Sequence, residues 1–239
     1  MNALPALGAA GVSRLDGLAS RPVLLLIAVA AMSIVPFVLL LMTSFVKIAV
    51  VLSILRSALG SAQIPPSQII TGLALILTLF IMAPTGERIL QAIEPELGQG
   101  RGTEILSGQS IEVLATAADK AKEPVRDFLL KHGSARDRSV FHALALRMRT
   151  GVAREAVTER DFLVLVPAFV ASELRRAFEI GFLIFIPFLV LDLVVSNLLL
   201  ALGMHMLSPT AVSLPFKLLL FVLADGWQLL LRGLVEGYV

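Results

Sequence analysis

Two pairs of long uncharged runs dominate the chain. The first pair lies within residues 22–86, with one run over 22–46 and another over 57–86. Each run is long enough to cross a hydrocarbon layer, which takes about 20 apolar residues in a helix. Pro36 predicts a kink or break in the first run, and Pro65-Pro66 separates the two helices. We therefore predict a hydrophobic helical hairpin over 22–86.

The second pair occupies residues 161–239. A capping-box pattern over 158–161 precedes a long apolar helix. The stretch GMHMLSP, residues 203–209, then forms a turn, and a further apolar stretch closes the chain. These features predict a second hydrophobic hairpin, with two methionines and a histidine in its turn.

The segment between the two hairpins, residues 87–160, carries most of the charged residues, with both signs in balance. We predict a polar helical middle domain that faces water or other subunits. Its helices should be short, with one ending before Pro124 and the next stopping at Gly133. A capping-box pattern over 134–137 starts a further helix, and residues 94–108 form a glycine-rich loop.

Composition supports a membrane or membrane-complex protein. Hydrophobic residues make up 57% of the 239 residues and charged residues 16%, and the mean hydropathy is +0.88. A soluble domain carries about 25% charged residues. The net charge of +2, without a basic run, gives no reason to expect nucleic acid as a partner. No strand-like alternation is evident, so the predicted fold class is all-α.

The first 21 residues are small and polar, with Arg14 and Arg21 ahead of the apolar run. A secretory signal peptide has a basic start and a short apolar core, but the run that follows is longer than such a core. We predict a polar N-terminal segment over 1–21 and a retained first helix. Cleavage near residues 28–31 is the alternative.

The sequence contains no pattern typical of catalysis or cofactor binding. No nucleophile and base stand at a recognisable spacing, and GQGRG over 98–102 does not connect a strand to a helix. Cysteine is absent, and His132, His142 and His205 each lack a second ligand at helical spacing. We therefore predict a protein that is not an enzyme and has no catalytic residue, cofactor or metal.

Ionisable residues inside apolar runs are the stronger signal. Asp192, Lys217 and Asp225 would each cost about 2.5–3.5 kcal/mol at the centre of a membrane helix. They could form a proton path in a proton-coupled membrane transporter, or they could form buried salt bridges between helices or subunits. Their wide spacing favours salt bridges, because Lys217 and Asp225 are two helical turns apart.

Two further groups each have two interpretations. Arg175 can pair locally with Glu179 four residues later, or the neighbouring Glu173 can reach a charge on another chain. The methionines around residue 205 can fill gaps in an ordinary turn. In a symmetric oligomer they can instead form a deformable ring around a pore, because methionine adapts its shape to its neighbours.

Three stretches resemble one family, that of flagellar export protein P and its injectisome counterpart, the R component of the type III secretion export apparatus. They run from MTSFVKIAVV to LFIMAP (42–84), from PAFVASELRR to LLLALGM (167–204), and from SPTAVSLPFK to DGWQLL (208–230). VKIAVVLSILRSALG and LALILTLFIMAP favour the injectisome form, whereas DGWQLL is similar to the flagellar ending. Of the two, we favour the injectisome form.

The resemblance implies a core channel-forming subunit of the export gate in the basal body of a secretion system. It implies about five copies of the chain, assembled with Q-type and R-type flagellar subunits or their injectisome counterparts S and T. The assembly surrounds a narrow channel for unfolded secreted proteins. It is expected at the bacterial inner membrane, in contact with lipid and partly on the periplasmic side.

The resemblance also assigns roles to individual residues. The family's methionine-rich gasket falls on Met204, His205 and Met206, where His205 departs from the usual methionine. Contacts between subunits or buried charge contacts fall on four residues: Arg138, Glu173, Asp192 and Lys217. Arg138 lies in surroundings that diverge from the family.

Overall fold

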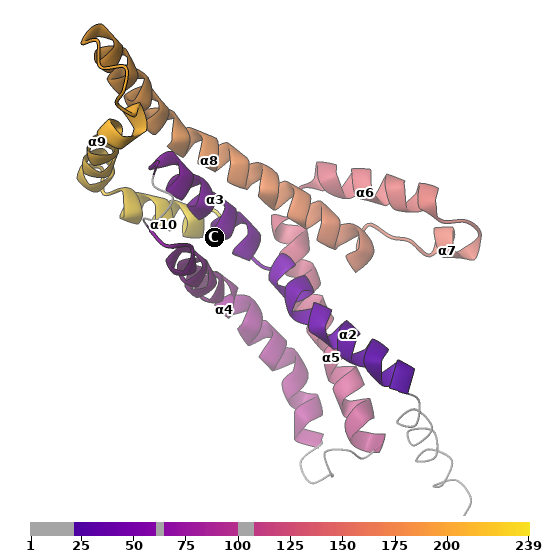
Figure 1. Ribbon diagram of the computed structural model, residues 1–239. Helices are drawn as coiled ribbons and strands as arrows, with labels where there is room; N and C mark the ends of the chain where they lie inside the picture. Colours follow the sequence, from indigo (N-terminus) through magenta and orange to yellow (C-terminus); the bar gives the residue numbers. More distant parts are fainter. Residues whose placement is uncertain (1–21, 61–64, 100–107) are drawn as a thin grey trace, which may run out of the picture. The chain divides into compact units, whose positions relative to one another are not determined.

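The computed structural model describes residues 22–60, 65–99 and 108–239 (Figure 1). Every regular element in these ranges is a helix, which confirms the predicted all-α fold class. The predicted polar segment over 1–21 and most of the glycine-rich loop lie outside the described residues. The helices are α2 (Pro22–Leu41), α3 (Phe45–Ala58), α4 (Ser67–Gln99), α5 (Gly108–His132), α6 (Ala135–Met148), α7 (Val152–Glu155), α8 (Phe162–Ala201), α9 (Pro209–Leu223) and α10 (Gly226–Glu236).

Several helices are longer than predicted. We expected a helix to end before Pro124, but α5 continues through that residue. α2 likewise continues through Pro36. A proline inside a helix removes one backbone hydrogen bond and crowds the preceding turn. The backbone hydrogen bonds on either side of each proline keep these two helices continuous. α4 extends to Gln99, so the loop predicted from residue 94 begins later.

The chain divides into two compact units, which are described separately. Unit 1 comprises residues 1–40 and 87–124, and unit 2 comprises residues 41–86 and 125–239. Unit 2 contains all the residues of the candidate site. One boundary between these units falls after residue 86, as in the predicted domains, but none falls at 160. The predicted domain organisation stays a prediction.

The core of unit 2 forms where α3 packs along α8. Ile48, Val51, Leu52 and Leu55 lie on one face of α3 and are buried, as expected for residues three and four apart on a helix. On α8, Gly181 faces α3, where a Cβ atom would lie 2.4 Å from Ile54 Cδ1. The missing side chain therefore allows the two helices to approach closely.

Helix α8 also packs against α6 and α9. α9 packs against α8 as the return arm of the second predicted hairpin, which Figure 1 shows in orange and yellow. Among the described residues, Ser67–Pro95 of α4 and the whole of α8 are long and apolar enough to cross a membrane. The number rises to four if each of two bent helix pairs is one span.

Candidate functional site

A sharp turn at the end of α8 presents the two methionines and the histidine. Gly203 has φ +73°, the left-handed conformation that commonly ends a helix. The Gly203 N–H donates to the Leu200 carbonyl at 3.1 Å, and the Met204 N–H donates to the Leu199 carbonyl at 2.9 Å. This is the Schellman pattern of a helix C-terminus. We call residues 202–208, between α8 and α9, the methionine loop.

The side chains of the methionine loop contact little of their own chain. Met206 is 98% exposed, and Met204, His205 and Leu207 are also exposed. Met206 therefore does not fill a gap within its own chain. Exposed large apolar side chains, when they gather, commonly mark a surface that contacts another molecule.

A second group of residues joins helices α3, α8 and α9. Lys217 of α9 is only 1% exposed, and its Nζ donates to Asp192 Oδ2 of α8 at 2.6 Å and to the Ala58 carbonyl of α3 at 3.0 Å. The Ser213 hydroxyl donates to Asp192 Oδ1. We call Asp192, Ser213 and Lys217 the clamp. Within this chain, the ion-pair partner of Lys217 is therefore Asp192 on the neighbouring helix α8.

The third ionisable residue of the apolar runs, Asp225, does not join the clamp. It lies exposed between α9 and α10, with φ +49°. The three residues that a proton path would need are therefore not brought together in one chain.

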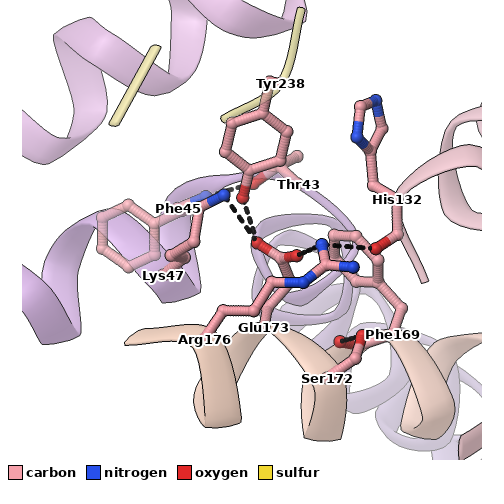
Figure 2. A network of polar contacts seen from close by, with 9 residues as sticks. All are labelled: Thr43, Phe45, Lys47, His132, Phe169, Ser172, Glu173, Arg176 and Tyr238. Carbon is pink, nitrogen blue, oxygen red and sulfur yellow. Dashed lines mark hydrogen bonds and ion pairs between the residues drawn. The ribbon is translucent and has the colours of Figure 1, made fainter. Parts of the chain in front are cut away.

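A third group surrounds Glu173, which is completely buried in α8 (Figure 2). Arg176 Nη1 donates to Glu173 Oε1 at 2.9 Å, and Lys47 Nζ lies 3.5 Å from Oε2. The Tyr238 hydroxyl also donates to Oε2. Lys47 Nζ lies 3.4 Å from the centre of the Tyr238 ring, within range of a cation–π interaction. We call Lys47, Glu173, Arg176 and Tyr238 the Glu173 network.

The Glu173 network contains two cations and one carboxylate, and its surroundings reflect this imbalance. His132 lies beside it, with its ring centre 5.1 Å from that of Tyr238. Burial lowers the pKa of His132 to about 4, and the positive charges of Lys131, Lys47 and Arg176 add to that effect. Burial and the Glu173 carboxylate raise the pKa of Tyr238. Tyr238 therefore stays a hydrogen-bond donor and His132 stays neutral at pH 7.

Arg138 lies apart from Glu173 and Lys217. Its Nη1 donates to the Leu130 carbonyl at 3.4 Å, and its Nε lies 4.0 Å from Glu159 Oε2. Nε is buried without a hydrogen-bond partner. Within one chain the four predicted charge contacts thus fall in three places, and contacts between subunits stay a prediction.

The predicted local pair of Arg175 with Glu179 is wrong. Arg175 Nη2 instead donates to both carboxylate oxygens of Asp137 on α6. The packing of α6 against α8 brings Asp137, whose side chain is 13% exposed, within reach of Arg175. A partly buried ion pair is screened less than a pair on the surface of one helix.

The sequence did not identify Lys47, His132 and Tyr238 as members of a site. A charge inside an apolar stretch was the available signal for Lys47. No local pattern marks Tyr238, because it lies 65 residues from Glu173 along the chain. Among the residues that the structure describes, no group of three or more histidine, aspartate or glutamate side chains could hold a metal ion.

These features define a class of protein: an all-helical, strongly apolar subunit with ion pairs buried between helices and an exposed methionine loop at a hairpin tip. A model of the FliP family matches residues 28–234, and the chain belongs to that family. Members of this family are components of the type III secretion export apparatus.

Curated relatives come from both secretion and flagellar systems. The chain is 45% identical over 217 residues to Yop proteins translocation protein R of Yersinia pestis, which covers 90% of this chain and 95% of the relative. It is 41% identical over 214 residues to hypersensitivity response secretion protein HrcR of Ralstonia nicotianae, with 90% and 96% covered. It is 42% identical over 220 residues to flagellar biosynthetic protein FliP of Bacillus subtilis, with 92% and 93% covered. These similar identities do not separate injectisome from flagellar members.

Proposed function

We propose that this chain is a channel-forming subunit of a type III secretion export gate, with the methionine loop as the constriction. Several copies would surround one path, and each would contribute Met204, His205 and Met206 to it. The path would conduct unfolded secreted proteins out of the cytoplasm. The observation that carries the proposal is the exposed methionine loop at the free end of the α8–α9 hairpin.

The chemistry of the loop suits a closed but yielding gate. A narrow apolar constriction excludes hydrated ions by dewetting. Methionine has three rotatable bonds and a polarisable thioether, so it adapts to irregular neighbours. A ring of such side chains can close tightly and still yield to a passing polypeptide. No covalent step is required of this subunit.

The proposed assembly contains about five copies of the chain with Q-type and R-type subunits, or their S and T counterparts. The family and the apolar helices support a position at the bacterial inner membrane, and we place part of the assembly on the periplasmic side. The stretches that favour the injectisome form support a secretion system of that type.

The residues predicted to form contacts between subunits differ in how exposed their side chains are. The side chains of Asp192 and Arg138 are 32% and 20% exposed, which leaves each an edge for a partner chain. Glu173 and Lys217 are buried in contacts within their own chain. A contact between subunits at Glu173 or Lys217 would therefore have to replace an existing one.

Ion flux through the reconstituted assembly tests the proposal. Replacing both methionines, Met204→Ala with Met206→Ala, should raise the flux of small ions through the closed assembly several-fold, because the ring loses bulk. Arg232→Ala is the matched control, since Arg232 is exposed on α10 away from the loop. Equal flux in the loop variant and the control would contradict the proposal. So would a stable monomer in native mass spectrometry of the protein expressed with its neighbouring genes.

The alternative function, a proton-coupled transporter that uses Asp192, Lys217 and Asp225, has no support from the relatives. The structure gives this alternative no support either, because Asp225 lies apart from the clamp that holds Asp192 and Lys217.

A further inference from the structure

The end of α3 lies against the first turn of α9, directly beside the methionine loop. Gly60 follows α3, and a Cβ atom on it would lie 2.9 Å from Thr210 Cγ2. Two carbon atoms in ordinary contact are about 3.5–4.0 Å apart. The Thr210 methyl group therefore rests against the space that Gly60 leaves free. Thr210 lies two residues beyond Ser208, the last residue of the methionine loop.

Gly60 differs from the other described glycines that have a positive φ. Its φ is +79°, in the left-handed region that residues with a side chain disfavour. Gly151 and Gly203 share this conformation, but a Cβ atom on either of them would contact no other part of the chain. At Gly60, the absence of a side chain therefore serves a contact between two helices as well as a turn.

Lys217 forms a second contact between α9 and the end of α3. Its Nζ donates to the Ala58 carbonyl at 3.0 Å. The last carbonyls of a helix have no partner within that helix, and a cation beside them also interacts favourably with the helix dipole. Nζ would lie 3.4 Å from a Cβ atom on Gly60. We call residues 58–60, which contact Thr210 and Lys217, the α3 seat.

The methionine loop is joined to both arms of its hairpin by backbone hydrogen bonds. On the α8 side, the Met204 N–H donates to the Leu199 carbonyl at 2.9 Å. On the α9 side, the Val212 N–H donates to the Ser208 carbonyl at 3.3 Å. The α3 seat and the clamp together hold the first turns of α9. A displacement of these turns therefore moves Ser208 and, with it, the end of the loop.

We propose that the α3 seat positions the methionine loop, and that the contact of Gly60 with Thr210 sets where the start of α9 lies. An added Cβ atom at residue 60 would push the first turn of α9 away from α3, so that α9 tilts about the clamp. Threonine has only two favourable χ1 rotamers in a helix, which limits how far its methyl group can turn aside. This proposal rests on the proposed function of the loop as the constriction.

Moving one methyl group between the two residues tests the α3 seat in the intact assembly. Both residues are otherwise exposed, so the variants change this contact and little else. Gly60→Ala should raise ion flux through the closed assembly about three-fold or more, because close-packed contacts transmit a displacement. Gly60→Ala with Thr210→Ser transfers the methyl group, so flux should return to the wild-type level.

Stability separates positioning from a structural role. The melting temperature should be lowered by a few degrees in both Gly60→Ala variants, because alanine stays strained at a positive φ. Gly151→Ala is the matched control, since it carries the same strain and makes no new contact. It should lower the melting temperature by a similar amount and leave flux unchanged.

Three results would overturn the α3 seat. The first is unchanged flux in an assembled Gly60→Ala variant. The second is a rise in flux that Gly151→Ala reproduces, and the third is a rise that Thr210→Ser fails to reverse.

Variants of Thr210 alone decide the matter if Gly60→Ala fails to assemble. Thr210→Ser removes the methyl group from the contact, and flux should rise about two-fold because the start of α9 loses its support. Thr210→Val keeps a methyl group there and should leave flux unchanged. Equal flux in these two variants overturns the α3 seat. If Met204→Ala with Met206→Ala changes flux and the seat variants do not, the seat alone is wrong. If that loop variant leaves flux unchanged, the proposed function is wrong.

Discussion

Glu173, in the first third of α8, and Met206, just beyond the end of that helix, lie in opposite surroundings. Glu173 is buried and contacts three side chains of its own chain, whereas Met206 is almost fully exposed. About 40 Å of helix separates Glu173 from Ala201 at the end of α8, at 1.5 Å per residue. The base of α8 is therefore complete within one chain, and the tip needs other molecules to cover it. Changes at the base should alter stability, and changes to the exposed side chains of the tip should alter function with little effect on stability.

The largest stability effect is expected at the base. Glu173→Ala leaves Lys47 and Arg176 without their carboxylate, and an unpaired buried charge costs about 3–5 kcal/mol. We expect a lower melting temperature in detergent and a lower yield of folded protein. Glu179→Ala, an exposed change on the same helix, should have an effect below about 0.5 kcal/mol. Equal losses from the two variants would contradict the described base.

The next loss of stability is expected from changes in the clamp. Lys217→Met leaves the partly exposed Asp192 carboxylate without its cation, and we expect a loss of about 2–3 kcal/mol, measured by thermal unfolding. Adding Asp192→Leu should recover a large part of that loss, because replacing both partners of an ion pair by apolar residues is often neutral or stabilising. A double variant less stable than either single one would show that the pair is not the main interaction.

Stability should fall in acid because of His132. Its pKa in the folded chain, about 4, lies below the ordinary value of 6.5, so the folded state favours the neutral ring. Stability is complete above pH 6.5 and is lost as the pH falls toward 4, by up to about 3 kcal/mol. Unfolding at several pH values should show this dependence in the wild type. In His132→Phe it should be weaker, and identical profiles would contradict the assignment.

The smallest stability effect is expected at the tip. Met206→Ala should change the free energy of unfolding by less than about 0.5 kcal/mol, because an exposed side chain loses little on truncation. Gly203→Ala should cost about 1 kcal/mol, because alanine disfavours the left-handed conformation. Thermal unfolding of both variants against the wild type tests this order. A larger loss for Met206→Ala would show that the loop is covered within one chain.

The sequence predicted the class of fold well because apolar periodicity and length are local properties. It also located the turn of the second hairpin, since Gly203 and Pro209 bracket it. The extent of α5 could not be predicted, because Pro124 raises the cost of a helix without forbidding it.

Partners of buried charges were harder to predict than the charges themselves. Lys217 had to have a partner, but Asp192 lies 25 residues away and spacing alone does not select it. No sequence pattern marked Tyr238, because only the packing of the residues after α10 brings it to Glu173. The single-chain structure adds these pairings, and the resemblance adds the expected role of the methionine loop.

Cross-linking through Met206→Cys tests the central claim most directly. The chain has no cysteine, so this variant carries a single thiol at the tip of the α8–α9 hairpin. If several methionine loops meet at one constriction, mild oxidation of the assembled complex should yield disulfide-linked pairs of this chain. Leu229→Cys, at an exposed site on α10, should yield far fewer. An assembled Met206→Cys complex that forms no linked pairs would contradict the claim that the loops converge.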